Sequence, residues 1–284
     1  MFNPATDWGP ALRGQRHQNA IGVGWRRDFG SHGLQANFRQ DQDSEFGRKG
    51  TGSLGWGWAF LPGWRVTASS ATTFRAPTLY QRFSEYGEPT LTPESGRNFE
   101  WGLRWASGNR ELSLTGWRNE ISDLIDWRSD RGNCPNRLAD PVWGGCFANV
   151  GEARLQGQSL AGQVSLNRVR LKASADFQNP RNLATDKVLP RRARRSALIA
   201  AEGVVRGWTL GSEWKVVDSR FDDADNANSL AGYGIVNVYF SRHLRHGLTL
   251  EGRIDNLGDR RYELARTFAT GGLSGHIGLR WSMQ

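Results

Sequence analysis

The sequence predicts an all-β protein, specifically an antiparallel β-barrel that crosses a membrane, and three observations lead to this. Many segments of the 284-residue chain alternate apolar and polar residues with period two. Most of these segments hold ten to thirteen residues, whereas strands of soluble sheets hold ~5–6 and tilted membrane-crossing strands ~9–11. Short turns and long loops alternate between them, as in barrels of the bacterial outer membrane.

The amino-acid composition agrees with this class. The chain contains 35 glycines and 13 tryptophans, and 38% of its residues are apolar. Glycine and tryptophan in this abundance favour a strand-rich protein over a helical one. The sequence has no apolar run near the ~18–20 residues that a membrane-spanning helix needs, which excludes a helical membrane protein.

The alternation predicts about thirteen strands. It is clearest where the odd residues from Val169 to Phe177 are apolar and the even residues from Arg170 to Gln178 are polar. The expected strands lie near 17–28, 31–43, 49–60, 64–75, 97–107, 110–127, 149–165, 168–179, 194–205, 208–219, 232–242, 246–257 and 272–282.

The connections between these strands differ in length at the two edges of the sheet. Short turns follow residues 28, 60, 107, 165, 205 and 242, and long loops are expected near 76–96, 128–148, 180–193, 220–231 and 258–271. The connection near 44–48 is the one short member of the long-loop edge. Pro77 has no N–H to donate, so we expect the strand before it to end there. Long loops that leave a rigid scaffold commonly carry binding residues.

A barrel of this size would have a water-filled lumen, and the polar residues of each strand would face it. Charged residues expected on the lumenal side are Glu213, Lys215, Glu251, Arg253 and Arg280. The apolar residues would face lipid, and a closed barrel would satisfy the backbone of such a wall. Tryptophans near strand ends (Trp56, Trp64, Trp208 and Trp281) fit an aromatic girdle, with ordinary packing as the alternative.

The formal net charge of +9 indicates either an anionic surface as partner or charges spread over solvated faces. We expect no nucleic-acid partner, because no nucleic-acid-binding motif accompanies the charge. The basic residues gather only at Arg191, Arg192, Arg194 and Arg195, where a long loop returns to the membrane. Arginine suits contact with lipopolysaccharide phosphates there, and a generic basic anchor is the alternative.

Two cysteines, Cys134 and Cys146, lie in one Gly/Pro/Asn-rich segment, away from the five histidines. A disulfide that staples the loop is favoured over free thiols, and it implies an oxidising compartment. The first residues, "MFNPATD", lack the charged and apolar regions of a signal peptide.

The acidic run "FDDADNAN" offers oxygen ligands from Asp222, Asp223 and Asp225 that suit calcium, although a solvated acidic loop is the alternative and the spacing is not that of an EF-hand. No other cofactor is expected. The sequence contains no catalytic motif such as G-x-S-x-G or H-E-x-x-H, so no enzymatic activity is expected. His276 could be read as a base in the lumen but is better explained as an ordinary lumenal residue.

Three stretches resemble motifs of TonB-dependent outer-membrane receptors. The first, "TTFRAPTLYQRF" followed by "PTLTPESGRNFEWGLRW", is similar to a strand end and the entry into the next strand of that family. The second is "NVGEARLQGQSL" at 149–160, and the third is "IDNLGDRRYELARTFATGGLSGHIGLRW" at 254–281. The stretches "TDKVLPRRARRS" at 185–196 and "YELARTFATGG" look closest to the cobalamin-transporter branch.

The resemblance implies a 22-stranded barrel with an N-terminal plug domain and a TonB box. Neither plug nor box is found in this sequence, so residues 1–284 are expected to form the C-terminal part of one receptor barrel, about 13 strands of the 22. The usual final aromatic residue is replaced by Ser282-Met283-Gln284 after Trp281.

The resemblance also implies a function: import of a scarce nutrient, cobalamin first of all, through the outer membrane of a Gram-negative bacterium. TonB, ExbB and ExbD would drive it through the plug, and the receptor would be a monomer surrounded by lipid and lipopolysaccharide. The alternatives are a ferric siderophore or haem receptor, a porin or barrel enzyme, and a soluble β-rich binding protein. Substrate contacts are expected at Tyr80, Phe83, Tyr86, Trp127 and Trp143.

Overall fold

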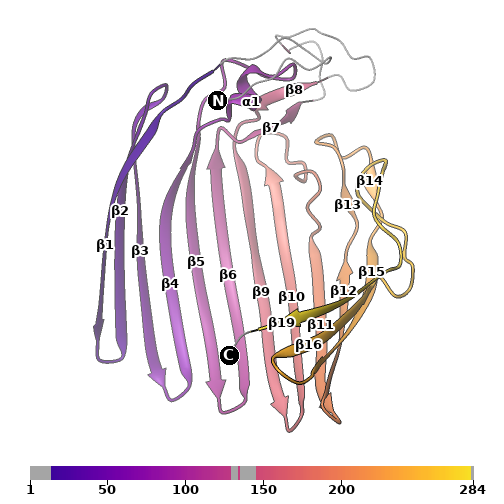
Figure 1. Ribbon diagram of the computed structural model, residues 1–284. Coiled ribbons are helices and arrows are strands. Elements are labelled where there is room, and N and C mark those ends of the chain that lie inside the picture. Colours follow the sequence, from indigo (N-terminus) through magenta and orange to yellow (C-terminus); the bar gives the residue numbers. More distant parts are fainter. Residues whose placement is uncertain (1–13, 129–133, 135–144, 283–284) are drawn as a thin grey trace.

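One thirteen-stranded antiparallel sheet forms most of the molecule (Figure 1). The computed structural model describes residues 14–128, 134 and 145–282. Each strand pairs with the next along the chain, which confirms the thirteen predicted strands. They are β1 (Gln18–Phe29), β2 (His32–Asp43), β3 (Gly47–Leu61), β4 (Trp64–Arg75), β5 (Glu94–Ser107), β6 (Arg110–Ser122), β9 (Ala153–Leu166), β10 (Val169–Asn182), β11 (Arg195–Val205), β12 (Trp208–Val217), β15 (Tyr233–His243), β16 (Leu248–Asp255) and β19 (Ser274–Trp281).

The remaining elements lie at the long-loop edge, here called the loop end, opposite the short turns of the turn end (Figure 1). In the described residues they are the five-residue helix α1 (Leu79–Phe83) and three small hairpins. The hairpins pair β7 (Ile125–Arg128) with β8 (Cys146–Asn149), β13 (Arg220–Phe221) with β14 (Ser229–Leu230), and β17 (Glu263–Ala265) with β18 (Phe268–Ala269). The described part of the chain holds no helix of a length and hydropathy that would cross a membrane.

Two predicted strands were wrong in extent. The strand expected at 110–127 ends at Ser122, because Asp123 adopts a left-handed conformation (φ 57°) that takes the chain out of the ladder. Leu124 then turns inward and is buried, and Ile125 begins the separate hairpin strand β7. The strand expected at 149–165 begins instead at Ala153, because Asn149 still pairs with Ile125.

The strand registers divide the sheet residues into two faces, because directly paired residues point to the same side. One continuous row contains Glu111, Gln163, Lys172, Ala200 and Glu213. We call this polar side the lumenal face. The alternate residues form the outward face, which carries large exposed apolar side chains.

Those outward apolar side chains are found from one edge of the sheet to the other. Ile21 on β1 is 75% exposed and Ile277 on β19 is 77% exposed. A sheet that presents such a face along its whole width needs an apolar surrounding, which a bilayer supplies. The structure therefore supports the predicted transmembrane β-barrel wall.

An aromatic belt follows the turn end of the outward face. The rings of His32, Trp58, Phe60, Trp64 and Trp105 succeed one another with centroids 5.4 to 6.2 Å apart, and Trp56 joins them beside His32. Farther along, Trp208 contacts Phe240 and the guanidinium of Arg242. Aromatic rings gather in this way at membrane–water boundaries, so the belt marks one boundary of the membrane.

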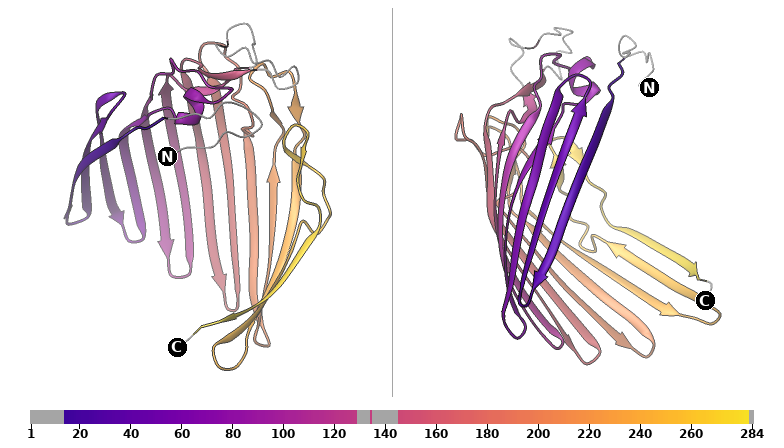
Figure 2. Two further views of the ribbon diagram at one scale, coloured as in Figure 1. Left: turned by 45° about the horizontal axis from the view of Figure 1, so that its top comes forward. Right: turned by 90° about the vertical axis from the view of Figure 1, so that its left-hand side faces the viewer.

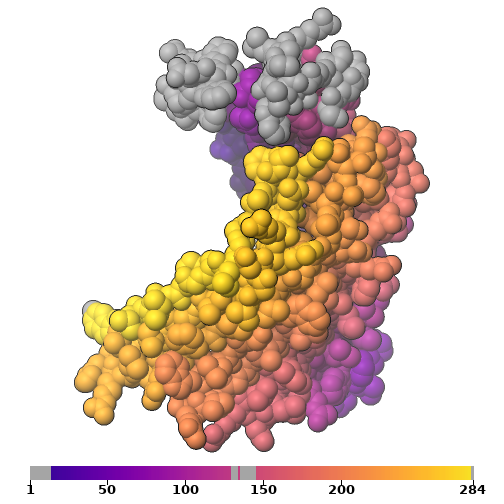
Figure 3. Space-filling model, turned by 90° about the vertical axis from the view of Figure 1, so that its right-hand side faces the viewer, coloured from indigo at the N-terminus to yellow at the C-terminus, as the bar shows by residue number. Residues whose placement is uncertain are grey.

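The sheet is curved and its two edges are β1 and β19 (Figure 2). In the described residues these two strands do not pair with each other, so the wall is open. Viewed from the side of the C-terminal strands, the molecular surface is hollowed between the loop end and β19 (Figure 3).

Glu94 connects three elements at the loop end. Its carboxylate forms an ion pair with Arg75 of the neighbouring strand β4, and its Oε1 accepts a hydrogen bond from the backbone N–H of Ile125 (2.8 Å). The residue is only 8% exposed. A buried carboxylate with both a cation and an N–H donor is stably placed, so Glu94 holds hairpin β7/β8 against β4 and β5.

Reversing the polarity of adjacent positions tests the two faces. In the complete receptor, Ile199→Arg places a charge on the outward face and should lower the free energy of unfolding in lipid bilayers by about 2–4 kcal/mol. Ala200→Arg faces the lumen beside Glu213 and should have little effect. Urea unfolding of both variants measures the difference. Equal losses would contradict the assignment of faces.

Removing the Glu94 carboxylate tests the connection to β7. Glu94→Ala should accelerate hydrogen exchange of the Ile125 amide by about tenfold or more, because that N–H loses its acceptor. Strand amides in the middle of β5 and β6 should keep their protection. Glu88→Ala is the control, since among the described residues that carboxylate accepts side-chain and backbone hydrogen bonds from Thr90 alone. Unchanged exchange at Ile125 would show that other contacts hold the hairpin.

Candidate binding site at the loop end of the barrel

The loop after β4 is shaped by a short capped helix. Pro77 is fully buried and ends β4, as predicted. Thr78 caps α1: its hydroxyl accepts from the Gln81 N–H (3.1 Å), and the Gln81 side chain accepts from the Thr78 N–H (2.9 Å). This reciprocal pair fixes the start of α1 and thereby the direction of Tyr80.

Hydrogen bonds join this loop to hairpin β7/β8. The Phe147 N–H donates to the Tyr86 carbonyl (3.0 Å). The Asn149 side chain accepts from the Thr92 N–H (2.9 Å) and donates to the carbonyls of Thr92 (3.0 Å) and Asp123 (2.7 Å). Two loops that are far apart in the sequence therefore form one platform.

Four aromatic rings meet on this platform, and we call them the aromatic cluster: Tyr80, Tyr86, Trp127 and Phe147. Phe147 packs edge-on against Tyr80 (6.0 Å between centroids) and Trp127 (5.6 Å), and Trp127 packs edge-on against Tyr86 (5.5 Å). Edge-to-face packing of this kind stabilises the arrangement of the rings. Tyr80 remains 43% exposed, so a ring face is open to a ligand.

The structure thus brings together three of the five residues expected to contact substrate. Phe83 is not in the cluster, because its ring lies under the guanidinium of Arg82 (4.7 Å). Trp143 lies outside the described residues. Phe147 was missed, although its place beside Cys146 in the same loop was the signal that could have identified it.

Partial burial raises the pKa of the Tyr80 hydroxyl, and the nearby Glu85 carboxylate and Tyr86 add to this effect. Tyr80 therefore remains a neutral phenol at physiological pH. A neutral hydroxyl both donates and accepts hydrogen bonds, which suits recognition of a polar ligand edge beside the aromatic face.

A disulfide joins Cys134 and Cys146, the pairing favoured over free thiols, with 5.7 Å between the Cα atoms. Cys146 is buried and immediately precedes Phe147. The crosslink therefore restricts the segment that carries one ring of the aromatic cluster.

Arg82 connects the platform to the β2–β3 connection. Its guanidinium forms an ion pair with Glu45 and lies over the Phe46 ring (5.3 Å). It also donates to the Pro89 carbonyl (2.8 Å). These contacts occupy the cation, so Arg82 positions the loop and is not itself a free anion-binding group.

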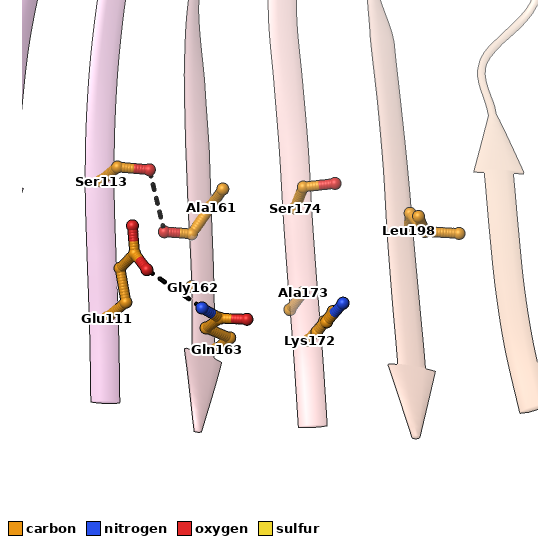
Figure 4. Close-up of a pocket in the computed structure, with 9 residues that line it drawn as sticks. All are labelled: Glu111, Ser113, Ala161, Gly162, Gln163, Lys172, Ala173, Ser174 and Leu198. Atoms are coloured by element: carbon orange, nitrogen blue, oxygen red, sulfur yellow. Dashed lines mark hydrogen bonds between the residues drawn. The ribbon is translucent and has the colours of Figure 1, made fainter. Parts of the chain in front are cut away.

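Below the platform, the lumenal face is lined with polar and charged groups. Figure 4 shows a recess there, formed by side chains of β6, β9, β10 and β11. Gln163 donates to Glu111 (3.0 Å) and the Ser113 hydroxyl to the Ala161 carbonyl (3.4 Å), with Lys172 and Leu198 beside them (Figure 4). A hydrated passage suits such a wall.

The five charges predicted for the lumen occupy this face, and four of them, Glu213, Glu251, Arg253 and Arg280, form ion pairs there. Arg253 contacts Glu213 (2.9 Å) and Asp255 (2.6 Å), and Arg280 contacts Glu251 (2.7 Å). Pairing of this kind keeps ionised groups stable beside water without making a separate binding site.

The three aspartates considered for calcium make separate contacts. Asp222 pairs with Arg191 (2.7 Å) and Asp225 with Lys187 (2.8 Å). Partial burial acts to raise the pKa of Asp223, but N–H donors from Ala227 and Asn228 outweigh it and lower that pKa. In the described residues no group of three or more His, Cys, Asp or Glu side chains is placed to hold a metal ion, so calcium at this loop stays a prediction.

The four arginines predicted to contact lipopolysaccharide lie in three different surroundings. The guanidinium of Arg191 is engaged by Asp222 in the loop. Arg194 and Arg195 stand at the loop end of β11 and line a recess that opens mainly on the outward face. Arg192 is exposed and does not line it.

This arrangement supports non-covalent binding. Exposed rings next to hydrogen-bonding groups can hold a large organic ligand by stacking and by contacts to its polar edge. The lumenal face below the platform is lined with polar and charged side chains, which suit contact with water and with a polar ligand.

Solved structures of similar fold include two metal transporters and a ferric enterobactin receptor. The copper transporter OprC aligns with a TM-score of 0.78 at 17% identity, over 92% of this chain and 47% of OprC. The FrpB iron transporter from Neisseria meningitidis gives 0.71 at 16% identity over 93% and 45%. A mutant of the ferric enterobactin receptor PfeA from Pseudomonas aeruginosa gives 0.74 at 16% identity over 92% and 44%.

The chain spans about half the length of these solved structures. At such identities the likeness shows the shared fold. The family model described as "TonB dependent receptor-like, beta-barrel" matches residues 3–257, which is most of the sequence. The chain therefore belongs to the family of TonB-dependent receptor-like β-barrels.

Proposed function

We propose that this chain supplies barrel wall and ligand-binding loops to a receptor that imports a scarce nutrient through the outer membrane of a Gram-negative bacterium. The observation that carries this proposal is the aromatic cluster, held at the loop end by a disulfide and by backbone hydrogen bonds. The cluster stands at the loop end of a sheet whose lumenal face carries polar and charged side chains. Such a receptor takes its energy from TonB through its plug domain, and no bond is made or broken in the ligand.

The ligand class that we favour is a metal chelate with a large organic frame. Each aromatic contact is worth ~0.5–1.5 kcal/mol beyond the area that it buries, so several rings can bind such a frame tightly. A ferric siderophore is the first candidate, because the solved structures of this fold include an iron transporter and a ferric enterobactin receptor.

Cobalamin is the second candidate, and sequence motifs favour it. The stretches at 185–196 and 262–272 are similar to the cobalamin-transporter branch. In the structure the first stretch is joined to the loop that follows β12. Asn226 accepts from the Val188 N–H (2.9 Å) and donates to its carbonyl (2.8 Å). Direct binding measurements with both ligands separate the two candidates.

Removing the indole of Trp127 tests the binding surface. In the complete receptor, Trp127→Ala should weaken the binding of the preferred chelate about tenfold or more, because two edge-to-face contacts and the ligand contact are lost together. Calorimetric titrations with ferric enterobactin and with cobalamin measure the affinity and show which ligand binds.

Trp214→Ala is the matched control, since this tryptophan is half exposed on the outward face of β12 and is not part of the aromatic cluster. The Trp214→Ala receptor should bind the ligand with the same affinity as the unaltered receptor. If Trp127→Ala binds as tightly as the control, the aromatic cluster is not the binding surface. If neither ligand binds the unaltered receptor, the metal-chelate class is wrong.

A further inference from the structure

The outward face changes from apolar to basic within a short distance of the loop end. The register of β5, β6, β9 and β10 places Arg97, Glu120, Arg154 and Arg181 in one row across four strands. Two rows below, Trp101, Gly116, Gln158 and Phe177 are neighbours, and Arg195 continues this row on β11. The row below that consists of Leu103, Leu114, Leu160, Ala175 and Ala197. Successive rows are ~7 Å apart along the strands.

A recess lies where these rows meet. Arg118, Arg181, Arg194 and Arg195 line it together with the rings of Phe99 and Phe177. Glycine makes part of its floor: a Cβ on Gly116 would lie 2.4 Å from the Trp101 ring, so the ring can lie flat on the wall only because that position is glycine. Phe99 and Phe177 are about half exposed, at 50% and 53%.

The recess has a surplus of positive charge. Arg118 and Arg154 share one carboxylate, that of Glu120, at 3.1 and 3.0 Å. Arg181 pairs with Asp186 (3.0 Å). In the described part of the chain, neither Arg194 nor Arg195 has a carboxylate within ion-pair distance. Five guanidinium groups are thus accompanied by two carboxylates, which leaves a net charge of three.

We propose that this recess binds the phosphorylated headgroup of a lipopolysaccharide molecule in the outer leaflet. Guanidinium groups bind phosphate by paired, charge-assisted hydrogen bonds. The rings of Phe99 and Phe177 stand in the rows of Arg118 and Arg195, and the leucine row lies next to them toward the membrane interior, where it contacts the acyl chains. The site stands on the outward wall at the loop end, and it is separate from the aromatic cluster.

The width of the site selects a headgroup with more than one phosphate. Arg118 on β6 and Arg195 on β11 are separated by three strand spacings, about 14 Å at ~4.8 Å each. A glycerophospholipid carries a single phosphate that one end of the recess would satisfy. A bis-phosphorylated glycolipid with several acyl chains can occupy both ends and also cover the apolar row.

The test measures glycolipid binding to the complete receptor purified in a mild detergent. The altered receptor carries Arg118→Gln, Arg181→Gln and Arg195→Gln. The control carries Arg27→Gln, Arg110→Gln and Arg242→Gln, which remove the same charge from the outward face at the turn end. Native mass spectrometry counts bound bis-phosphorylated lipid A, and heat-modifiable migration on a gel checks that each barrel is folded.

We expect the altered receptor to bind lipid A about tenfold or more weakly, whereas the control binds as the unaltered receptor does. Dephosphorylated lipid A should bind the unaltered receptor as poorly as the altered receptor binds lipid A. Equal losses in the two variants would overturn the proposal, because they would reflect net charge alone. Displacement of lipid A by millimolar inorganic phosphate would overturn it in favour of a free-anion site.

If the triple substitution prevents folding, Arg195→Lys alone decides the question. This residue has no carboxylate partner in the described part of the chain, so its replacement disturbs no ion pair of the wall. Lysine keeps the charge but cannot form the paired hydrogen bonds, so lipid A binding should fall several-fold. Unchanged binding would count against the site.

Discussion

The register of the strands is the constraint on which the rest of this structure depends. Side chains along a strand alternate between two faces, so a slip of one residue between neighbours would exchange the faces. Within a bilayer every backbone N–H and C=O of the wall must also be paired in the ladder. The same pairing that satisfies the backbone of β10 therefore also sends Lys172 to the lumenal face and Leu171 to the outward face.

The two ends of the sheet differ in the length of their connections and in what those connections form. At the turn end the connections are short, and the outward face finishes in the aromatic belt around Trp58 and Trp64. At the loop end the connections are long enough to fold on their own, and they do so through Glu94, Asn149 and the disulfide. The rigid wall thus positions a loop platform, and the platform positions the aromatic rings. Arg118, Arg181 and Arg195 lie at this same end of the sheet, on the outward face that meets lipid.

Much of this fold could be predicted because the period-two pattern is local. Val169–Phe177 shows its two faces within nine residues, and Pro77 marks a strand end by its own chemistry. The extra hairpin β7/β8 could not be seen in this way. It depends on the left-handed backbone of Asp123 and on the Glu94 carboxylate, which comes from a strand much earlier in the sequence.

The candidate binding site could be predicted only in part, because some of its residues are recognisable locally and others come together only through strand pairing. Tyr80, Tyr86 and Trp127 stand out as aromatic residues in expected loops, whereas Phe147 becomes a partner only when β8 pairs with β7. The acidic run at 222–225 suggested calcium by composition, but Arg191 and Lys187 from another loop engage two of its carboxylates. The outward basic rows cannot be recognised along the chain, because Arg97 and Arg181 meet in one row only through the registers of three strand pairs.

The most direct test of the account is a spin-label scan of the complete receptor in bilayers, with one label at each position from Val169 to Phe177. Accessibility to oxygen, which enriches in lipid, should peak at odd positions, and accessibility to a water-soluble nickel chelate at even positions. Two profiles without opposite period-two phases would contradict the membrane-wall assignment on which the receptor function rests.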